Sequence, residues 1–515
     1  MGLLTTNEKL INHIYDVIVV GGGHAGIEAA LSSARIGHST LMLCGNFFRI
    51  GNMPCNPSIG GPAKGILVRE IDALGGEMAK AADKTALQIK MLNISKGPAV
   101  RAMRVQSDKV AYKTYMQNVT SNTENLDIYI SLVDKLIVEE GTIKGVTLED
   151  GTNIYAKSVI ITTGTYLSSC ILVGKTSTPS GPDHENTNYG LSDSLRDLGF
   201  KNVYVVPEQE LPNGNFPTVD YPNPEDIKAF DLALKLAKKQ DADIVLATDP
   251  DADRMGIAAK NKEGEYVLLT GNQPGAILLD YLAKYKHTDK QRVVFNTIVT
   301  SNLAKAICER HGIELVQTLT GFKYIGDKIA RALENNGKVF QIGYEESYGY
   351  VIKDFVRDKD SFQATLLLCE VASFYKEQGK TLYDVLFDIF EDYGYYIEGV
   401  HNISLVGAEG SAKINQIMTH FQQNPLKELA GKEIVTIEDY QDSIRLERGV
   451  KSKLTLPKSF VLKYIFEDGG WFVLRPSGTE PKLKIYVAIK GNTLDDANEL
   501  IKRVKAEVLT IIDQI

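Results

Sequence analysis

The sequence predicts an α/β protein of several domains that closes with a separate α+β module. Three observations support this prediction. Strand-like apolar runs alternate with helix-like stretches along most of the chain, a glycine-rich turn joins a strand to a helix near its start, and the pattern changes after about Tyr395. At ~150 residues per domain, 515 residues correspond to three or four domains.

Short apolar runs bounded by helix-like stretches are the predicted strands. They are YDVIVV (15–20), STLMLC (39–44), SVIITT (158–163), ADIVLAT (242–248), RVVFNTIV (292–299) and GKVFQIGY (337–344). This rhythm predicts parallel sheets covered by helices on both faces. After Tyr395 the strands become longer and alternate, as in GWFVLRPSG and KLKIYVAI, and a helix follows from Thr493 to Ile515.

The composition excludes several classes of protein. With 43% hydrophobic residues and a mean hydropathy of −0.12, no apolar run approaches the ~20 residues that cross a bilayer, so we expect no membrane contact. The five cysteines form no C-x-x-C pair, which argues against a disulfide framework and a zinc site. The N-terminus has no basic, cleavable leader pattern, and we expect a cytoplasmic protein. The oligomeric state is left open.

Charge is distributed unequally along the chain. The formal charge is −1 up to Phe200 and −7 beyond it. Because an acidic surface repels phosphate backbones, any contact with nucleic acid is expected in the first half.

A dinucleotide-binding turn is predicted directly after the first strand. The sequence GGGHAG (21–26) has the G-x-G-x-x-G pattern between a strand and a helix. Gly21 would permit the tight turn, Gly23 the approach of a pyrophosphate, and Gly26 close helix packing. The alternative is a glycine-rich turn that binds nothing.

The second strand departs from the usual dinucleotide pattern. No acidic residue occurs between Glu28 and Glu70, so the ribose would lack its usual carboxylate, and Asn46 is a neutral substitute. A second glycine-rich stretch, GNMPCNPSIGGPAKG (51–65), contains Cys55. That cysteine is either a thiolate stabilised by backbone amides or an inert loop residue.

Residues from about 15 to 200 resemble the N-terminal part of the flavoprotein that modifies the wobble uridine of tRNA, the glucose-inhibited division protein A family. The matching motifs are GGGHAG, MPCNPSIGGPAKG, the helix VREIDALGGEMAKA, LNISKGPAVRAMRVQSDK and TTGTYL. The resemblance implies FAD at Gly21, Gly23 and Gly26, a catalytic role for Cys55, and tRNA as a partner. LNISKGPAVRAMR can equally be a solvated basic face.

An acidic loop follows the strand ADIVLAT. Asp249, Asp251 and Asp253 alternate along it, so three carboxylates can converge on one hard cation, and oxygen ligands favour Mg²⁺. An EF-hand is excluded, because its sixth and twelfth positions would be Arg254 and Lys260. The alternative is a solvated acidic turn whose charge Arg254 neutralises.

Two further loops are suited to a phosphorylated sugar. In Arg475-Pro-Ser477-Gly478-Thr479 a guanidinium, two hydroxyls and approachable amides suit a phosphate dianion; an ordinary Pro-Ser-Gly turn is the alternative. Between the acidic and phosphate loops, GYEESYG (343–349) could bind vicinal hydroxyls of a sugar.

The three loops, in this order, resemble those of the α-D-phosphohexomutases, which include phosphoglucomutase and phosphomannomutase. The resemblance runs from about Lys201 to the end and includes VPEQELPNGNFPTVDYPNPE, TLTGFKYIG and VRDKD. It implies Mg²⁺ on the three aspartates, a catalytic role for Arg254 beside them, and sugar hydroxyls on Glu345 and Ser347. It further implies the substrate phosphate on Arg475, Ser477, Gly478 and Thr479, and Lys323 near the transferred group.

The phosphoserine of that family is missing here. It stands in a Thr-Ala-Ser-His-Asn-Pro loop, and Ser-His-Asn occurs nowhere in this sequence. Ser180, in TPSG, lacks the flanking residues and is a decoy. The resemblance therefore covers the end of the second mutase domain and all of the third and fourth.

The sequence therefore predicts a hybrid chain whose seam lies within LSDSLRDLGFKNVYVVPEQ, where a helix ending at Gly199 precedes a strand from Lys201. The predicted parts are a partial FAD- or NAD(P)-binding Rossmann-like domain (1–200), part of mutase domain 2 (201–265), domain 3 (266–392) and an α+β domain (393–515). Three functions stay open: a mutase-lineage enzyme that binds Mg²⁺ and an unidentified hexose phosphate with impaired turnover, a flavin-binding tRNA-modification fragment, and a non-functional hybrid.

Overall fold

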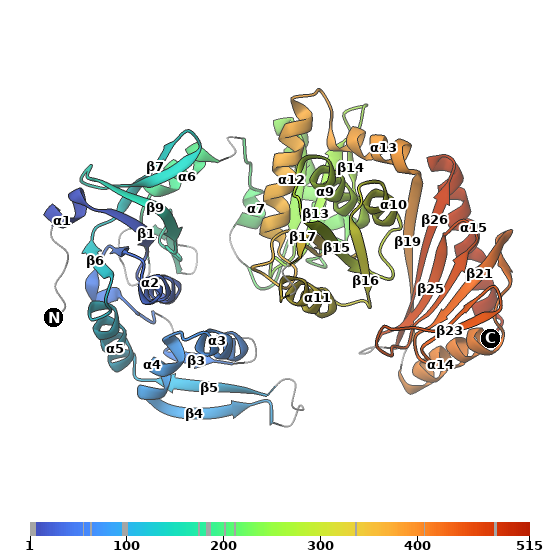
Figure 1. Cartoon of the computed structure of the whole chain (residues 1–515), viewed down its shortest axis with the longest axis horizontal. Helices are drawn as coiled ribbons and strands as arrows, with labels where there is room; N and C mark the ends of the chain where they lie inside the picture. The colour runs from blue at the N-terminus through green and yellow to red at the C-terminus, as the bar shows by residue number, and fades with distance from the viewer. Residues whose placement is uncertain are drawn as a thin grey trace. The chain divides into compact units, whose positions relative to one another are not determined.

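The computed structural model divides into two compact units, residues 1–203 and 204–515 (Figure 1). It describes residues 7–54, 56–61, 64–94, 101–173, 176–181, 187–199, 202–210, 213–334, 337–405, 407–477 and 481–515. Within these ranges, every helix is either too short or too polar to traverse a lipid bilayer.

The first unit is built on a six-stranded sheet in the order β6-β2-β1-β9-β8-β7. Its strands are β1 (Ile14–Val20), β2 (Thr40–Cys44), β6 (Leu126–Ile130), β7 (Val133–Glu139), β8 (Thr142–Leu148) and β9 (Asn153–Ile161). The four strands β6, β2, β1 and β9 are parallel, whereas β8 and β7 add antiparallel edges. The parallel strands predicted at 15–20, 39–44 and 158–163 are therefore confirmed.

Helices cover both faces of this sheet. On one face α2 (His24–Ile36) and α5 (Lys109–Ser121) bury Ile27, Leu31 and Met116 against β1 and β2. On the other face, α1 (Asn7–Asn12) and α6 (Gly190–Leu198) contribute Leu10 and Leu191 to a second core. The predicted double coverage is thus confirmed for this sheet.

The single helix predicted over VREIDALGGEMAKA is wrong, because the segment forms two helices. They are α3 (Lys64–Ala73) and α4 (Met78–Lys84). Gly75 adopts φ +90° and ends α3, a conformation that an L side chain rarely takes. The Glu28 carboxylate then accepts hydrogen bonds from the backbone N–H groups of Glu77 (2.9 Å) and Met78 (2.7 Å), which starts α4.

A second, three-stranded sheet lies beside these helices in the same unit (Figure 1). It consists of β3 (Ser58–Gly60), β5 (Ala102–Ser107) and β4 (Ala86–Leu92), and a separate two-stranded ribbon joins β10 (Cys170–Val173) to β11 (Thr176–Pro179).

The strand predicted after the seam is not present in the described residues 202–206. Val203, Tyr204 and Val205 are 67%, 47% and 57% exposed, and the next element is the short helix α7 (Pro207–Glu210). Their sequence is strand-like, but no strand within the described ranges accepts their backbone hydrogen bonds. Without a partner strand, this segment remains a connection between the two units.

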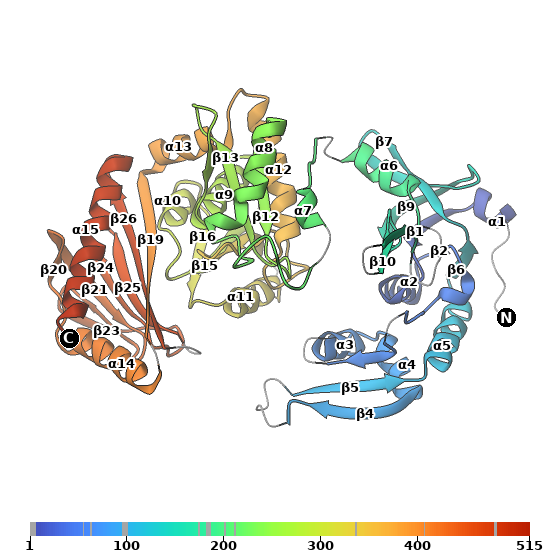
Figure 2. The same cartoon turned by 180° about the vertical axis from the view of Figure 1, so that it is seen from behind.

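The second unit begins with a small antiparallel sheet, β12 (Ile244–Thr248), β13 (Met255–Lys260) and β14 (Tyr266–Leu268). The parallel sheet predicted here is therefore wrong, because β12 and β13 form a hairpin. Helix α8 (Asp231–Gln240) lies on one face (Figure 2), with Phe230 and Ala237 against Val245 and Ala258. Met255 and Ile257 point into the larger core on the other face.

The middle of this unit is a four-stranded sheet in the order β16-β15-β17-β18. Strands β15 (Gln291–Thr297), β16 (Glu314–Thr318) and β17 (Lys338–Tyr344) are parallel, and β18 (Tyr350–Val351) is antiparallel. The parallel strands predicted at 292–299 and 337–344 are confirmed, whereas β16 was not predicted. Val293 and Phe295 face α11 (Phe322–Glu334), whereas Val294 faces α9 (Asn272–Tyr285) and α10 (Leu303–Arg310). Helices α12 (Ser361–Lys376) and α13 (Leu382–Tyr393) complete this layer.

The C-terminal module is an antiparallel sheet with two helices, which confirms the predicted α+β module and its C-terminal helix; the other helix, Gly407–Gln423, was not predicted. Its elements are β19 (Tyr395–Ser404), α14 (Gly407–Gln423), β20 (Glu428–Leu429), β21 (Lys432–Asp439), β22 (Ile444–Glu447), β23 (Val450–Lys453), β24 (Leu462–Phe466), β25 (Trp471–Pro476), β26 (Lys482–Gly491) and α15 (Leu494–Asp513). Phe472 and Leu474 face α14 and α15, whereas Trp471 and Val473 face the middle sheet. This period of two is that of a strand covered on both sides.

The module is joined to the middle sheet through the loop after β15. Ile298 and Val299 pack against Trp471 and Val473. The buried Lys463 donates from Nζ to the Ile298 carbonyl oxygen (2.7 Å) and lies 4.6 Å from the centre of the Trp471 ring. Burial lowers the pKa of Lys463 to about 8.

Candidate functional site

The acidic loop is the turn of the β12–β13 hairpin. One carboxylate oxygen from each of Asp249, Asp251 and Asp253 lies within 4.8 Å of the others. Asp249 Oδ1 accepts hydrogen bonds from the backbone N–H groups of Asp253 (3.1 Å) and Arg254 (3.0 Å), which fixes the turn. Burial, followed by the charges of Asp253 and Asp251, raises the pKa of Asp249. A divalent cation would relieve this repulsion, so the donor set fits Mg²⁺.

Hydrogen bonds connect the acidic loop to the rest of the unit. Ser361, the first residue of α12, donates both its N–H (3.2 Å) and its hydroxyl (2.6 Å) to the carbonyl oxygen of Ala252. The N–H of Met255 donates to the carbonyl oxygen of Tyr348 (3.0 Å), and Arg254 forms a β-bridge with Gly349. These contacts join the acidic loop to α12 and to the loop at 343–349.

Two cations surround the carboxylates. Lys359 Nζ lies 3.0 Å from Asp253 Oδ2. Arg254 donates to Glu225 Oε1 (2.6 Å), and its Nε lies 3.8 Å from both Asp249 and Asp253. Although burial acts against it, the carboxylates of Asp253, Asp358 and Glu345 raise the pKa of Lys359. A metal ion would share Asp253 with this ammonium group.

The loop at 343–349 buries two acidic side chains. Glu345 is 7% exposed, and burial together with the charge of Glu346 raises its pKa to about 7. Ser347 forms a hydrogen bond with Glu345 that opposes this rise. Glu346 accepts a hydrogen bond from Thr297 Oγ1 (3.1 Å), and burial raises its pKa against the positive charges of Arg475 and Lys484. The loop thus presents one carboxyl toward the acidic loop and the other toward the C-terminal module.

The remaining predicted residues of this half occupy separate elements. Arg475, at the end of β25, donates from Nη1 to the Tyr486 hydroxyl (3.3 Å), and the N–H of Ser477 donates to the carbonyl oxygen of Lys482 (2.7 Å). Gly478 and Thr479 lie outside the described residues. Lys323 is exposed near the start of α11, with its ammonium 5.0 Å from the centre of the Tyr324 ring.

The glycine turn in the first unit has the geometry that its sequence predicts. Gly21 adopts φ +119°, and its N–H donates to the carbonyl oxygen of Leu43 (2.8 Å). A Cβ on Gly26 would collide with the carbonyl oxygen of Gly21, whereas a Cβ on Gly23 would meet nothing within 4 Å. The open space at Gly23, at the start of α2, is what a pyrophosphate needs, so these residues fit a dinucleotide such as FAD.

Other predicted residues of the first unit have local structural roles or are not described. Asn46 accepts a hydrogen bond from the N–H of Phe48 (2.9 Å) and caps the 3-10 helix Phe47–Arg49. The Ser180 side chain is buried, and its hydroxyl donates to the carbonyl oxygen of Gly181 (2.9 Å). Cys55 lies outside the described residues.

Sequence reasoning missed the residues that support the acidic loop. Lys359 lies within the motif VRDKD, but nothing in that motif indicates its contact with Asp253. Ser361 and Glu225 also carried no signal, because each reaches the loop from a distant part of the chain.

Comparison with known families separates the two halves. Residues 16–206 match the family model "Glucose inhibited division protein A". Three phosphoglucomutase/phosphomannomutase models match the remainder: domain II over 183–264, domain III over 270–393 and the C-terminal domain over 428–506. The chain therefore has a hybrid architecture. The first and domain II matches overlap at 183–206, and α6 in this overlap packs into the first unit.

Individual relatives show the same division. Phosphoglucomutase of Staphylococcus aureus is 40% identical over 309 residues, which are 60% of this chain and 55% of the relative. The second half is therefore of phosphoglucomutase-family lineage, and the chain spans about half the length of the curated relatives it matches.

Solved structures also resemble the chain. Aquifex aeolicus GidA is 50% identical over 36% of this chain and 30% of that protein, with a TM-score of 0.35. A phosphoglucomutase from Paramecium, pp63/parafusin, is 16% identical, with a TM-score of 0.45 over 98% of this chain and 89% of that protein.

Two alanine substitutions in the glycine turn should differ in their effect on the stability of the first unit. Gly26→Ala should lower the free energy of unfolding of the first unit by about 1–3 kcal/mol, because the new methyl group collides with the backbone of Gly21. Gly23→Ala is the matched control and should unfold like the wild type, since its Cβ enters open space. Chemical unfolding followed by circular dichroism measures both; equal destabilisation by the two substitutions would contradict the packing role of Gly26.

Proposed function

We propose that the second unit binds Mg²⁺ and a hexose phosphate in the manner of a phosphohexomutase, with impaired turnover. The observation that supports this most directly is the attachment of the Asp249–Asp251–Asp253 loop to the Glu345–Ser347 loop by backbone hydrogen bonds. Together they would bring a cation-binding acidic group beside hydroxyl-binding side chains. The lineage of this half supports the same proposal.

In the proposed site each group has a separate task. Asp249, Asp251 and Asp253 would hold Mg²⁺, which supplies charge neutralisation to a phosphoryl group when bound. Arg254 and Lys359 position the carboxylates. Because its pKa is about 7, Glu345 can accept a hydrogen bond from a sugar hydroxyl or donate one to it near neutral pH, with Ser347 beside it.

The substrate phosphate would be held by the C-terminal module. Arg475 offers a guanidinium, and Ser477, Gly478 and Thr479 would add hydroxyl and amide donors. Lys323 would lie near the transferred group. The identity of the hexose is left to experiment.

The sequence lacks the serine motif that carries the phosphoryl group in phosphohexomutases. Phosphohexomutase chemistry passes a phosphoryl group from an enzyme serine to one hydroxyl of the sugar and recovers it from the other. The sequence contains no Ser-His-Asn, and the Ser180 side chain is buried with its hydroxyl bound to a neighbouring carbonyl oxygen. We therefore propose that binding persists while phosphoryl transfer fails.

A metal titration tests the acidic loop. Wild type should bind Mg²⁺, and Asp251→Asn should weaken binding at least ~tenfold by removing one exposed anionic ligand. Asp243→Asn is the matched control, because Asp243 is an exposed carboxylate outside the loop that pairs with Lys376. Isothermal titration calorimetry gives the affinities. An unchanged affinity in Asp251→Asn would rule out this metal site.

A turnover experiment tests the missing carrier. With Mg²⁺ and glucose 1,6-bisphosphate present, glucose 1-phosphate should not be converted to glucose 6-phosphate, yet glucose 1,6-bisphosphate should raise the Tm of the second unit. Labelled phosphate should not become attached to the chain. Conversion at a rate typical of mutases, abolished by Ser180→Ala, would refute the proposal, and a Tm unchanged by ligand would favour a non-functional hybrid.

A second candidate function is FAD binding by the first unit, as in a tRNA wobble-uridine modification protein. The open space at Gly23 at the start of α2 favours it. Purified protein should then absorb in the flavin band, and Gly23→Ala should reduce this absorbance while the unit stays folded. A colourless wild type that does not bind added FAD would exclude this function, and with it the case for tRNA as a partner.

A further inference from the structure

A cluster of lysines surrounds a cavity of about 340 Å³ in the middle of the second unit, where α9 ends, β17 begins and β18 ends. We propose that this cavity binds a small polyanion with two or more phosphate-type charges. Its lining residues are Lys286, Lys290, Lys338, Val339, Phe340, Ile352, Lys353 and Asp354.

The charges in this cavity are not balanced by the protein. Lys338 pairs with Glu314 (2.6 Å), but no described carboxylate forms an ion pair with Lys286, Lys290 or Lys353. Asp354 lines the cavity without forming an ion pair to a described residue. Three ammonium groups thus face the cavity without a paired anion, within a half of the chain whose net charge is −7.

Two of these ammonium groups influence each other. Lys286 and Lys353 line the same cavity. Burial and the charge of Lys353 lower the pKa of Lys286, while Glu370 acts in the opposite direction. Two like charges in one cavity cost free energy that a bridging anion would recover.

The size and walls of the cavity indicate a small molecule. About 340 Å³ is at the lower end of the range for small-ligand pockets. Val339, Phe340 and Ile352 form an apolar wall, which strengthens an ion pair by excluding water. A compact group with two phosphate-type charges can contact the Lys286–Lys353 pair and Lys290 together.

The cavity is separate from the proposed hexose phosphate site. Lys338 begins β17, and Tyr344 ends this strand directly before Glu345. Six residue steps at ~3.3 Å put the two ends of the strand ~20 Å apart. The Lys338 side of the cavity therefore lies at the opposite end of β17 from Glu345.

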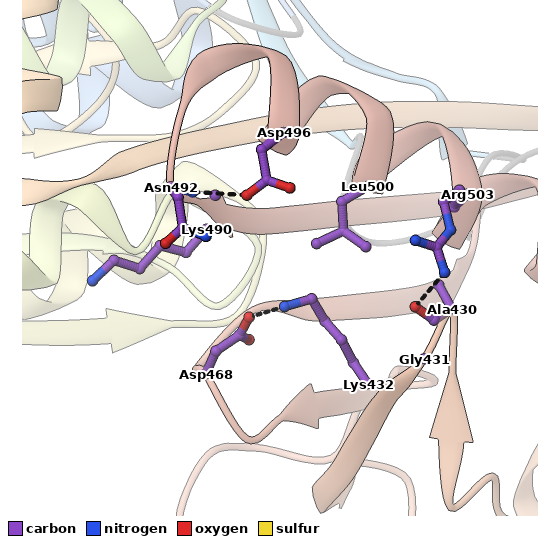
Figure 3. A pocket seen from close by; sticks show the side chains of 10 residues that line it. Ala430, Gly431, Lys432, Asp468, Lys490, Asn492, Asp496, Leu500 and Arg503 are labelled. Atoms are coloured by element: carbon purple, nitrogen blue, oxygen red, sulfur yellow. Dashed lines mark hydrogen bonds and ion pairs between the residues drawn. The ribbon is translucent and has the colours of Figure 1, made fainter.

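A larger cavity, of about 670 Å³, shows the contrasting case (Figure 3). It lies in the C-terminal module beside α15. Lys432 is paired with Asp468, Arg503 donates to the carbonyl oxygen of Ala430 (3.0 Å), and Asp496 accepts from the N–H of Asn492 (2.9 Å). Most of its charged groups already have partners within the protein. Lys490 lines this cavity and not the lysine-rich one, so it serves as the control lysine in the binding experiment.

Binding of inorganic pyrophosphate to the full chain tests the proposal. The titration is done by calorimetry at low ionic strength without Mg²⁺, so that the probe stays uncomplexed. Four proteins are compared: wild type, the double variant Lys286→Gln/Lys353→Gln, the control Lys490→Gln, and Arg475→Gln, which removes the guanidinium of the proposed hexose phosphate site.

Wild type, Lys490→Gln and Arg475→Gln should share one binding event that is at least ~tenfold weaker in the double variant, as expected for the loss of two charged contacts. The Tm of the unliganded double variant should not fall, because the substitution removes a repulsion. Equal affinity in the double variant, loss of the event in Arg475→Gln, or no binding by wild type at ~1 mM pyrophosphate would each overturn the proposal. The outcome is independent of mutase turnover, which this titration does not require.

Discussion

The second unit depends on the hydrogen bonds that attach the β12–β13 hairpin to the segments around it. Ser361 donates two hydrogen bonds to the Ala252 carbonyl oxygen, and Met255 donates one to that of Tyr348. A carbonyl oxygen left without a hydrogen bond inside the protein costs free energy, so these bonds favour the attached arrangement. Ala252 and Tyr348 both adopt positive φ, at +54° and +66°, so tertiary contacts hold the two loops in backbone conformations that non-glycine residues rarely adopt.

This attachment explains how a small three-stranded sheet can hold an ordered acidic loop. The three-stranded sheet alone has a small core, with Phe230 and Val245 on one face. Its other face is part of the large core that includes α9, α12 and α13. An acidic turn on an isolated hairpin would be only marginally stable. Here the neighbouring sheet supplies the burial, and the same packing places Lys359 and Glu345 beside the carboxylates.

The hybrid architecture has a visible structural consequence at the seam. Helix α6 packs into the first unit through Leu191, whereas the strand-like residues at 203–205 pair with no strand in the described part of the chain and are exposed. A helix satisfies its own backbone, but a strand requires a neighbour. A junction placed after a helix therefore leaves the fold of the preceding unit intact, whereas the strand-like residues that follow it lack a strand with which to form backbone hydrogen bonds. The two halves have separate hydrophobic cores, and each half matches a different protein family.

The sequence by itself determined the local features: the turn at Gly21–Gly26, the acidic loop, the parallel strands β1, β15 and β17, and the α+β module with its C-terminal helix α15. These depend on neighbouring residues, whose side chains and allowed dihedral angles the sequence specifies directly. Only the tertiary structure decided that β12 belongs to an antiparallel hairpin, that no strand forms at 202–206, and that Lys359, Ser361 and Glu225 support the acidic loop. Ser361 and Ala252 are 109 positions apart. Contacts over such separations depend on how whole elements pack, and no short pattern of residues records that packing.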